Sequence, residues 1–417
     1  MHGVHKHTCR AGRRPSPPQI LPHFEHLREN SVVKPVWQRA GVALALATSL
    51  LSVGRARAQS NAALDLSALS TKKRSVVAKD AQGSDVPLTL DAELQRTAGR
   101  LIAQANPIAA AVVLVDARSG NLLAFVERTA AGDEFGAMLL QASAPSASLF
   151  KLVTTAALLE HGHVNPKLRV CTSGGQHRIE RRHLERPRAR DAQCGLFFSA
   201  LGHSRNAVYA QLVTSHLMHS DLSDTVDAFG LNVSVPFDLP SPAAKVQLPY
   251  GDLEFARTAA GFENVQLSPL GAAQLAAIVM TGGQRMRFFI RRRAQNTLVL
   301  DGRAINSATA YTMRRMMEVT VHAGTSLDAF SAPGGQSYLG SVRVAGKTGT
   351  LKPDAKAATT SWFVGFAPSK QPEVLVSVVV QNGVVWRRKA NELARDMLRA
   401  WFARRGVPGV SDPFASQ

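Results

Sequence analysis

Three short motifs place serine, lysine and asparagine side chains at spacings suited to acyl transfer. Their residues, in chain order, are Ser148 and Lys151 of S-x-x-K, Ser204 and Asn206 of S-x-N, and Lys347, Thr348, Gly349 and Thr350 of K-T-G-T. A serine hydroxyl is a weak nucleophile until a nearby base accepts its proton, and a neutral lysine can be that base. The motifs therefore indicate nucleophilic catalysis by a serine.

Ser148 is the expected nucleophile, at the start of a helix. Positions i and i+3 of a helix share one face, so Lys151 Nζ can reach Ser148 Oγ. The first helical turn also offers unpaired backbone N–H groups and the positive end of the helix dipole. Lys151 is a base only when neutral, and we expect burial and the charge of Lys347 to lower its pKa. The backbone N–H groups of Ser148 and Thr350 would form an oxyanion hole.

The other motif residues suit proton transfer and substrate binding. We expect Ser204 to relay a proton towards the leaving amine and Asn206 to hold the substrate backbone. Lys347 supplies a positive charge, and Thr348 and Thr350 supply hydroxyls, for a terminal carboxylate. Taken singly, each motif has a plainer interpretation as a helix cap or a turn. Their order, spacing and expected contexts favour the catalytic interpretation.

The elements around these motifs predict one α/β domain. Helices are expected over about 91–100 (with Asp91 as N-cap), 148–161, 196–230, 268–281, 311–321 and 390–402, and strands over 109–115, 122–126, 342–345, 361–365 and 374–380. The K-T-G-T motif is also expected on a strand. Because strands occur near both ends of the sequence, we predict a sheet completed by the chain ends, with a helical insertion.

Residues 1–58 are typical of a leader with a secretory signal. The run 40–53 is apolar or small throughout, Lys34 and Arg39 precede it, and Ala56-Arg57-Ala58 follows as a cleavage site. At about 14 residues the run is short for a membrane span. An uncleaved anchor or a buried helix remains as an alternative.

The net charge is strongly positive. The 417 residues include 49 Lys and Arg against 30 Asp and Glu, a formal charge of +19, and 45% of residues are hydrophobic. Such a chain has ample apolar material for a folded core, and it lacks the long uncharged apolar stretches of a multi-pass membrane protein. Without residues 1–58, 40 basic and 28 acidic residues remain, which leaves a charge of +12.

Much of the remaining excess lies in two arginine clusters. They are Arg178, Arg181, Arg182, Arg186, Arg188 and Arg190, and Arg285, Arg287, Arg291, Arg292 and Arg293. Solvated loops are the plain interpretation of both, although either could rim a substrate cleft. Export disfavours nucleic acid as the partner and favours an anionic cell envelope.

The cysteines indicate a disulfide. Because Cys9 lies in the leader, export leaves Cys171 and Cys194 as the only pair, 23 positions apart. A metal site that adds His177 and His183 is an alternative, but its spacing fits no familiar zinc pattern. Two free thiols are a further alternative. No metal or other cofactor is expected.

With these motifs, the chain resembles the transpeptidase domain of the penicillin-binding proteins over about residues 86–403. Further segments carry the resemblance: Leu88–Gln95, Val115–Ala124, Ser268–Pro269–Leu270 with Gln274–Leu275–Ala276, Gly324–Thr325 and Trp362–Pro368. The family usually reads P-G-S-x-x-K, whereas Pro145-Ser146-Ala147-Ser148 has an extra residue and no glycine. A transglycosylase domain is also missing, so the chain reads as a bare transpeptidase domain.

The resemblance implies a three-layer α/β fold, with a mainly antiparallel sheet flanked by helices and a helical subdomain. The expected segments are a leader at 1–58, a linker at 59–85, the transpeptidase domain at 86–405 and a C-terminal tail at 406–417. Ser148 would attack D-Ala–D-Ala stem peptides of peptidoglycan, release D-Ala and pass the acyl group to an amine. The implied ligands are stem peptides and β-lactams, which trap the serine. Cell-division proteins or other cell-envelope proteins are possible partners. The implied location is the bacterial periplasm or the outer face of the cytoplasmic membrane.

Several other functions share parts of this pattern. A serine β-lactamase must also hydrolyse its acyl-enzyme, which class A enzymes do with a Glu in an E-x-x-L-N element, and none follows Asn206. The third residue of S-x-N also disfavours class D enzymes. A D,D-carboxypeptidase differs only in using water as acceptor, so the sequence scarcely separates it from a transpeptidase. The alternatives without catalysis are an inactive penicillin sensor and a basic envelope-binding protein.

Overall fold

The computed structural model describes residues 64–72, 75–129, 135–188, 192–352 and 358–415. The expected leader, residues 1–58, lies outside these described residues. Residues Ala56–Gln417 cluster into one compact unit, and every described element belongs to it. Among the described residues, no helix is long and apolar enough to cross a membrane.

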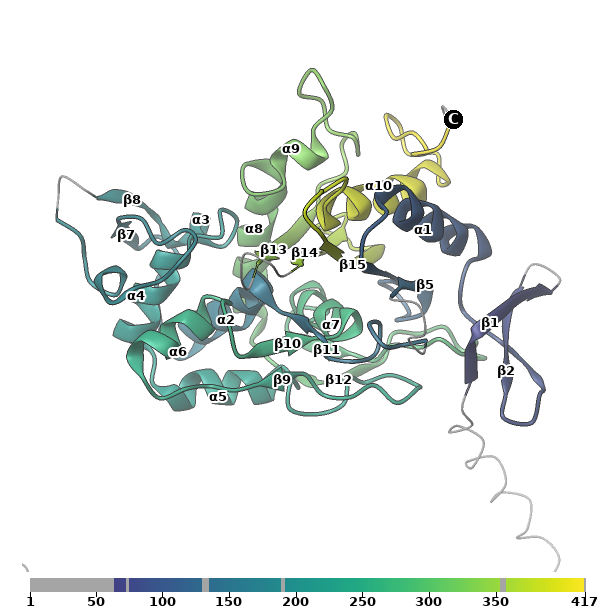
Figure 1. Ribbon diagram of the computed structural model, residues 1–417, viewed down its shortest axis with the longest axis horizontal. Coiled ribbons are helices and arrows are strands. Elements are labelled where there is room, and N and C mark those ends of the chain that lie inside the picture. The colour runs from purple at the N-terminus through teal and green to yellow at the C-terminus, as the bar shows by residue number, and fades with distance from the viewer. Residues whose placement is uncertain (1–63, 73–74, 130–134, 189–191, 353–357, 416–417) are drawn as a thin grey trace, which may run out of the picture. The chain divides into compact units, whose positions relative to one another are not determined.

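A five-stranded antiparallel sheet forms the centre, in the order β13-β14-β15-β4-β5 (Figure 1). Its strands are β4 (Ala109–Asp116), β5 (Leu122–Arg128), β13 (Ala345–Leu351), β14 (Thr359–Ala367) and β15 (Val374–Asn382). β15 pairs with β4, so strands from both ends of the sequence meet in the sheet, as predicted. The strand expected over 342–345 is misplaced, because β13 begins only at Ala345; it carries K-T-G-T, which was expected on a strand.

Helices cover both faces of the sheet because successive strand residues point to opposite faces. In β15, Val378 belongs to the apolar cluster that includes α1 (Ala92–Ala105) and α10 (Ala390–Ala403). The next residue, Val379, belongs to the cluster on the other face, which includes α7 (Pro269–Met280). The three-layer architecture is therefore confirmed (Figure 1).

The helical subdomain lies beside the sheet, where α2, α4, α5 and α6 pack on one another (Figure 1). The remaining helices are η1 (Ala147–Phe150, 3-10), α2 (Lys151–Glu160), η2 (Arg181–His183, 3-10), α3 (Phe197–Ala200), α4 (Asn206–His216), α5 (His219–Ala228), α6 (Asp252–Ala259), α8 (Ser307–His322) and α9 (Leu327–Phe330). Side chains cap several starts: Asp91 accepts from two N–H groups of α1, and Asn306 accepts from Thr309 in α8.

The expected linker at 59–85 is wrong for the described residues. β1 (Leu64–Lys72), β2 (Ser75–Asp80) and β3 (Asp85–Pro87) form a three-stranded antiparallel sheet. Its apolar pattern is short, since only Leu66 of β1 and the run Val76–Val77–Ala78 of β2 are buried. The other short strands are β6 (Ala144–Pro145), β7 (Arg169–Thr172), β8 (Gln193–Leu196), β9 (Lys245–Val246), β10 (Val265–Leu267), β11 (Gln284–Met286) and β12 (Leu300–Arg303).

The expected C-terminal tail, 406–417, also packs on the domain over its described part. Phe414 contacts the α1–α10 cluster, and the Arg100 guanidinium lies 3.7 Å from the centre of its ring. Arg399 of α10 donates to Ser411 Oγ at 2.7 Å. This segment is therefore part of the domain and not a free extension.

Candidate active site

The expected nucleophile lies in a tight turn between β6 and α2. Ser148 belongs to the 3-10 turn η1 that leads directly into α2, so the predicted helix start is in place. Ala147, just before it, has φ +48°, in the left-handed region. The missing glycine of the motif is thus replaced by an alanine in a conformation that favours glycine. Gly261 makes this turn possible, because a Cβ there would lie 2.0 Å from the Ala147 carbonyl oxygen.

Lys151, the first residue of α2, is fully buried beside the nucleophile. Its Nζ lies 2.9 Å from Ser148 Oγ, 2.6 Å from Asn206 Oδ1 and 2.5 Å from the Ala260 carbonyl oxygen. The two carbonyl-type oxygens can only accept hydrogen bonds. A neutral amine has two N–H groups for them, which leaves its lone pair for the Ser148 hydroxyl.

A second buried lysine, Lys347 of β13, faces the S-x-N motif. Its Nζ donates to Ser204 Oγ at 3.1 Å and to the Thr348 carbonyl at 2.6 Å. Ser204 has φ +54°, and Asn206 begins α4 and donates to the Gln176 carbonyl. The structure therefore brings the three motifs into one hydrogen-bonded group.

The two lysines are buried with no ionised carboxylate bonded to either of them in the described chain. Burial lowers the pKa of Lys151 well below its usual range, and the charge of Lys347 lowers it further. Burial lowers the pKa of Lys347 to about 7. Burial of Lys151 and the positive charge of Lys347 therefore favour the neutral Lys151 that general-base catalysis requires.

The K-T-G-T strand runs along the edge of the sheet next to the nucleophile. A Cβ at Gly349 would lie 3.3 Å from the Ser148 backbone nitrogen, so glycine lets the strand approach the turn closely. Thr348 Oγ1 lies 2.5 Å from the hydroxyl of Thr325. Thr350 lines the cleft together with Ser148.

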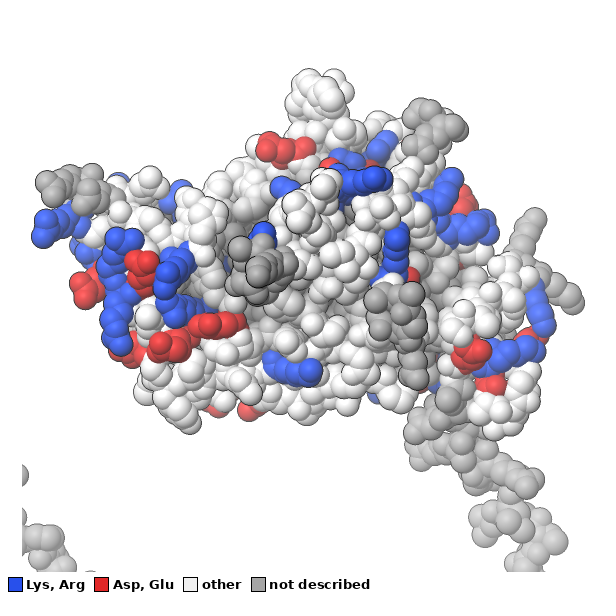
Figure 2. Space-filling view, viewed as in Figure 1, with Lys and Arg blue, Asp and Glu red and all other residues white. Residues whose placement is uncertain are grey.

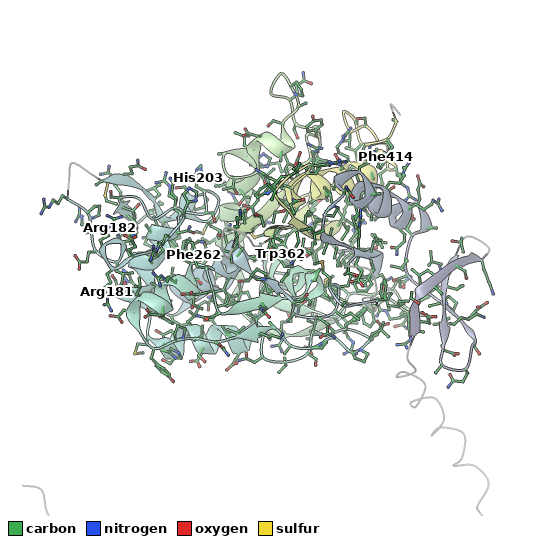
Figure 3. All side chains as sticks on the ribbon, viewed as in Figure 1. Arg181, Arg182, His203, Phe262, Trp362 and Phe414 are labelled. Carbon is green, nitrogen blue, oxygen red and sulfur yellow. A yellow bond between two sulfur atoms is a disulfide. The ribbon has the colours of Figure 1, made fainter. Side chains whose placement is uncertain are left out.

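Two adjoining pockets, of about 570 and 330 Å³, meet at Ser148 and form the cleft. Both are lined by Ser148, Gln176, His177, Asn206 and Thr350. The larger also reaches Thr325, Thr348, His203, Arg205, Lys389 and Asn391, and the smaller reaches Phe262, Leu351, Lys352 and Trp386. In Figure 3, His203 and Phe262 lie on the helical side and Trp362 on the sheet side of this region.

A lobe closed by a disulfide forms one wall of the larger pocket. Cys171 of β7 and Cys194 of β8 are bonded directly, at paired positions of the two strands. His177 lines the cleft, whereas His183 accepts a hydrogen bond from the Glu180 backbone N–H. Within the described ranges, no three His, Cys, Asp or Glu residues are grouped to hold a metal ion.

The two arginine clusters differ in their positions. In the first, Arg181 and Arg182 belong to η2 on the lobe, where Figure 2 shows basic side chains interspersed with acidic ones. In the second, Arg285 donates to the Asp301 carbonyl of β12, and Arg293 donates to the Ser119 carbonyl in the turn between β4 and β5. No described arginine of either cluster lines the cleft, so the structure places none of these described residues at its rim.

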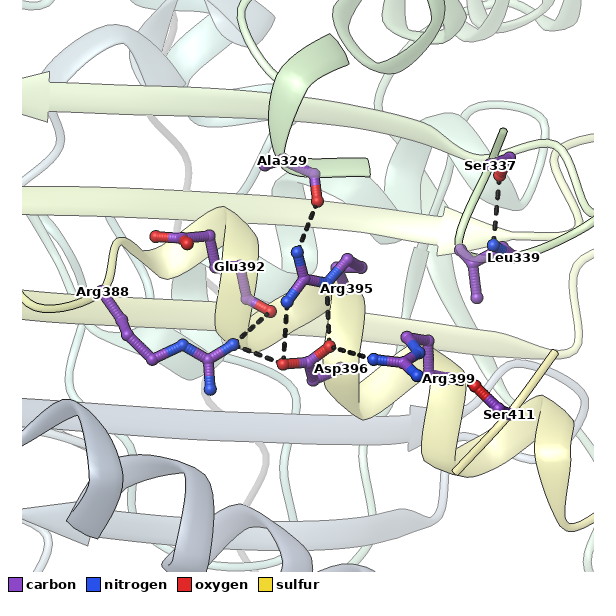
Figure 4. Close-up of polar contacts among 9 residues, drawn as sticks. All are labelled: Ala329, Ser337, Leu339, Arg388, Glu392, Arg395, Asp396, Arg399 and Ser411. Carbon is purple, nitrogen blue, oxygen red and sulfur yellow. Dashed lines mark hydrogen bonds and ion pairs between the residues drawn. The ribbon is translucent and has the colours of Figure 1, made fainter. Parts of the chain in front are cut away.

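The start of α10 is held against the cleft by a buried charge cluster (Figure 4). Arg388, Arg395 and Arg399 all contact the Asp396 carboxylate, and Arg395 also donates to the Ala329 carbonyl at 2.8 Å. Although burial opposes ionisation, hydrogen bonds and charge from Arg395 and Arg388 lower the pKa of Asp396. These contacts fix the helix that presents Lys389 and Asn391 to the larger pocket.

The motifs predicted that Ser148, the two lysines, Ser204, Asn206 and the threonines share one site, but they did not identify several other residues that line the cleft. Arg205 lies inside S-x-N, and Thr325 follows a glycine in a resembling segment, so both had a local signal. Lys389 and Trp386 come from the loop before α10, and nothing in their spacing links them to Ser148.

A comparison with protein families matches residues 110–399 to the penicillin binding protein transpeptidase domain. Among curated proteins, the chain is 25% identical over 344 residues to peptidoglycan D,D-transpeptidase PbpA of Mycobacterium tuberculosis, covering 73% of this chain and 69% of that one. It is 24% identical over 336 residues to stage V sporulation protein D of Bacillus subtilis, covering 72% of this chain and 50% of that protein.

Solved structures agree on the fold. The ceftriaxone acyl-enzyme complex of M. tuberculosis penicillin-binding protein A has a TM-score of 0.63 and 21% identity, covering 76% of this chain and 80% of that one. The transpeptidase domain of Burkholderia pseudomallei penicillin-binding protein 3 has a TM-score of 0.63 and 20% identity, covering 78% of this chain and 98% of that one.

Proposed function

The chain belongs to the penicillin-binding protein transpeptidase family, and we propose that it is a peptidoglycan D,D-transpeptidase with Ser148 as its nucleophile. The observation that carries the assignment is the contact of 2.9 Å between the Nζ of the fully buried Lys151 and Ser148 Oγ. Because the two N–H groups of a neutral Lys151 are taken by carbonyl-type oxygens, its lone pair is left to accept the serine proton.

In the proposed acylation, Ser148 Oγ attacks the carbonyl carbon of the penultimate D-Ala as its proton passes to Lys151. The backbone N–H groups of Ser148 and Thr350 stabilise the oxyanion. Ser204, bonded to Lys347, returns a proton to the departing nitrogen. The C–N bond breaks, D-Ala leaves, and the acyl group remains as an ester on Ser148.

Substrate binding in this proposal uses Thr348, Thr350 and Asn206, which line the larger pocket, and the buried Lys347 next to them. Lys347 and the hydroxyls of Thr348 and Thr350 hold the terminal carboxylate of the stem peptide, and Gly349 lets the strand lie close to the turn that carries Ser148. Asn206 positions the peptide amide. A β-lactam enters the same site, and Ser148 opens its ring.

The proposed location is the envelope side of the cytoplasmic membrane, because peptidoglycan is assembled there and residues 1–58 have the pattern of an export signal. In an oxidising compartment the disulfide between Cys171 and Cys194 is maintained. Whether the leader is removed or retained as an anchor, the catalytic domain would lie outside the cytoplasm.

A fluorescent penicillin tests the proposal. The wild-type protein should take one label, and cell fractionation should find it outside the cytoplasm. Ser148→Ala should take no label. Lys151→Ala should be labelled at least about 100-fold more slowly while keeping its circular dichroism spectrum. An unlabelled wild type, or equal labelling of Ser148→Ala, would disprove the assignment. Rapid loss of label would favour a β-lactamase, and release of D-Ala without transfer to an added amine would favour a carboxypeptidase.

A further inference from the structure

The larger pocket carries positive charge on opposite walls and no negative charge among its described lining residues. Arg205 is the residue directly before α4, and Lys389 is the residue directly before α10. Neither Asp nor Glu occurs among the described residues that line either pocket. A pocket of this composition attracts anionic groups and repels cationic ones.

Arg205 is available to a ligand. Its guanidinium packs over β8, where a Cβ at Gly195 would lie 3.4 Å from Arg205 Nη1, so the glycine leaves room for it. In the described part of the chain, this guanidinium has no hydrogen-bond or ion-pair partner. Its charge acts on the cleft, because it adds to burial in lowering the pKa of the neighbouring His203.

The opposite wall has unused polar groups as well. The Lys389 ammonium lies 5.4 Å from the centre of the Trp386 ring, and it has no hydrogen bond among the described residues. Asn391 is 8% exposed, and its Oδ1 has no described partner although its Nδ2 donates to Ser326. A buried polar atom without a partner is costly, which suggests that a ligand satisfies it.

If the enzyme transfers its acyl group to an amine, as proposed above, the geometry of that transfer determines which substrate enters the larger pocket. The assignment of this pocket therefore rests on the proposed function. In the proposed reaction the leaving D-Ala departs from the side of Thr348, which lines the larger pocket and not the smaller one. By microscopic reversibility, the attacking amine takes the position that the departing amine vacated. The acceptor strand therefore occupies the larger pocket.

We propose that Arg205 and Lys389 make the larger pocket an acceptor subsite that selects amines whose peptide carries a second free carboxylate. The first carboxylate, next to the amine, takes the place left by that of D-Ala. The second is bound by Arg205 or Lys389. The amine nitrogen then attacks the ester carbonyl, the bond from carbon to Ser148 Oγ breaks, and the amine proton returns to Ser148 Oγ through Lys151 and Ser204.

The test compares acceptors that differ only in charge. The purified enzyme is acylated by a D-Ala–D-Ala peptide in the presence of D-glutamate or D-glutamine as the acceptor. The comparison is repeated with the corresponding pair of amino acids whose side chains are one methylene longer. Mass spectrometry gives the ratio of transferred to hydrolysed product. The wild type should prefer the carboxylate member of at least one pair by about tenfold. The preference should appear as a lower acceptor concentration at half-maximal transfer.

The variants locate the preference. Arg205→Gln and Lys389→Gln should each reduce it, the double variant should abolish it, and Arg205→Lys should restore part of what Arg205→Gln loses. Lys370→Gln, which removes one exposed positive charge outside the described cleft, is the matched control and should keep it. A wild type without preference, or an unchanged preference in the double variant, would overturn the proposal. Penicillin labelling is measured on the same samples, so failure of acylation is distinguished from failure of acceptor selection.

Discussion

Two buried lysines with different tasks stand at the centre of the site. In the proposed mechanism Lys151 must be neutral to accept the serine proton, whereas Lys347 would bind a carboxylate best when it is charged. Burial lowers the pKa of both, and the charge of Lys347 further lowers that of Lys151. The pair therefore works only if the two groups titrate in this order, with Lys151 losing its proton first.

Replacing Lys347 by glutamine should change the pH dependence of acylation. The rate falls on the acid side as Lys151 becomes protonated, and the positive charge of Lys347 opposes that protonation. Without this charge the pKa of Lys151 rises, so the acid limb of the acylation rate should move to higher pH. Rates of penicillin acylation between pH 5 and 9 measure it. A limb that stays in place, or moves to lower pH, would show that Lys347 does not tune Lys151.

The proposed nucleophile is positioned by three backbone segments that approach one another closely at two glycines. The turn η1 holds Ala147 in a left-handed conformation, the loop after α6 brings Gly261 against the Ala147 carbonyl, and β13 brings Gly349 against the Ser148 nitrogen. Trp362 of β14 completes the arrangement by donating to the Pro145 carbonyl at 2.8 Å. Each contact limits where Ser148 can lie relative to Lys151.

Gly261→Ala should disrupt this turn. The new Cβ would lie 2.0 Å from the Ala147 carbonyl oxygen, at a residue with φ +83°, so the segments must separate. We expect a loss of at least about 2 kcal/mol in the free energy of unfolding and about a 100-fold slower acylation, because small displacements of reacting groups are costly. Denaturant unfolding and penicillin labelling measure the two effects.

Gly83→Ala is the matched control for this strain. Gly83 also has a positive φ, +77°, but a Cβ there has no atom within 4 Å. It should lose about 1 kcal/mol from the left-handed backbone alone and label at the wild-type rate. If both variants behave alike, the close approach of Gly261 to the turn has no catalytic importance.

The sequence predicted elements and motifs well where a regular pattern or a fixed spacing carries the information. Lys151 follows Ser148 by one helical turn, and the K-T-G-T strand needed only its own residues to be recognised. The sheet β1–β3 was missed because its buried run is three residues long. Arg205 and Lys389 were missed as partners because only the folded chain brings α4 and α10 to one pocket.

At the scale of the whole molecule, the helical subdomain and the sheet share one core. The cluster on the α7 face of the sheet includes Val153 of α2 and Val208 of α4 together with Leu375 and Val379 of β15. The sheet itself needs both ends of the sequence, since β4 pairs with β15. Neither part can lose its packing without exposing apolar surface of the other, so we expect one cooperative unfolding transition.

The disulfide should therefore stabilise the whole domain and not the lobe alone. Cys171 and Cys194 close a loop of 23 positions, for which loss of the cross-link costs about 3 kcal/mol, or about 5 °C for a domain of this size. Replacing both by serine should shift thermal unfolding by this amount, with far-ultraviolet circular dichroism and tryptophan fluorescence changing together. The wild type in reductant should match the variant. A separate, earlier transition of the helices, or an unchanged midpoint, would mean that the lobe unfolds independently of the sheet that carries K-T-G-T.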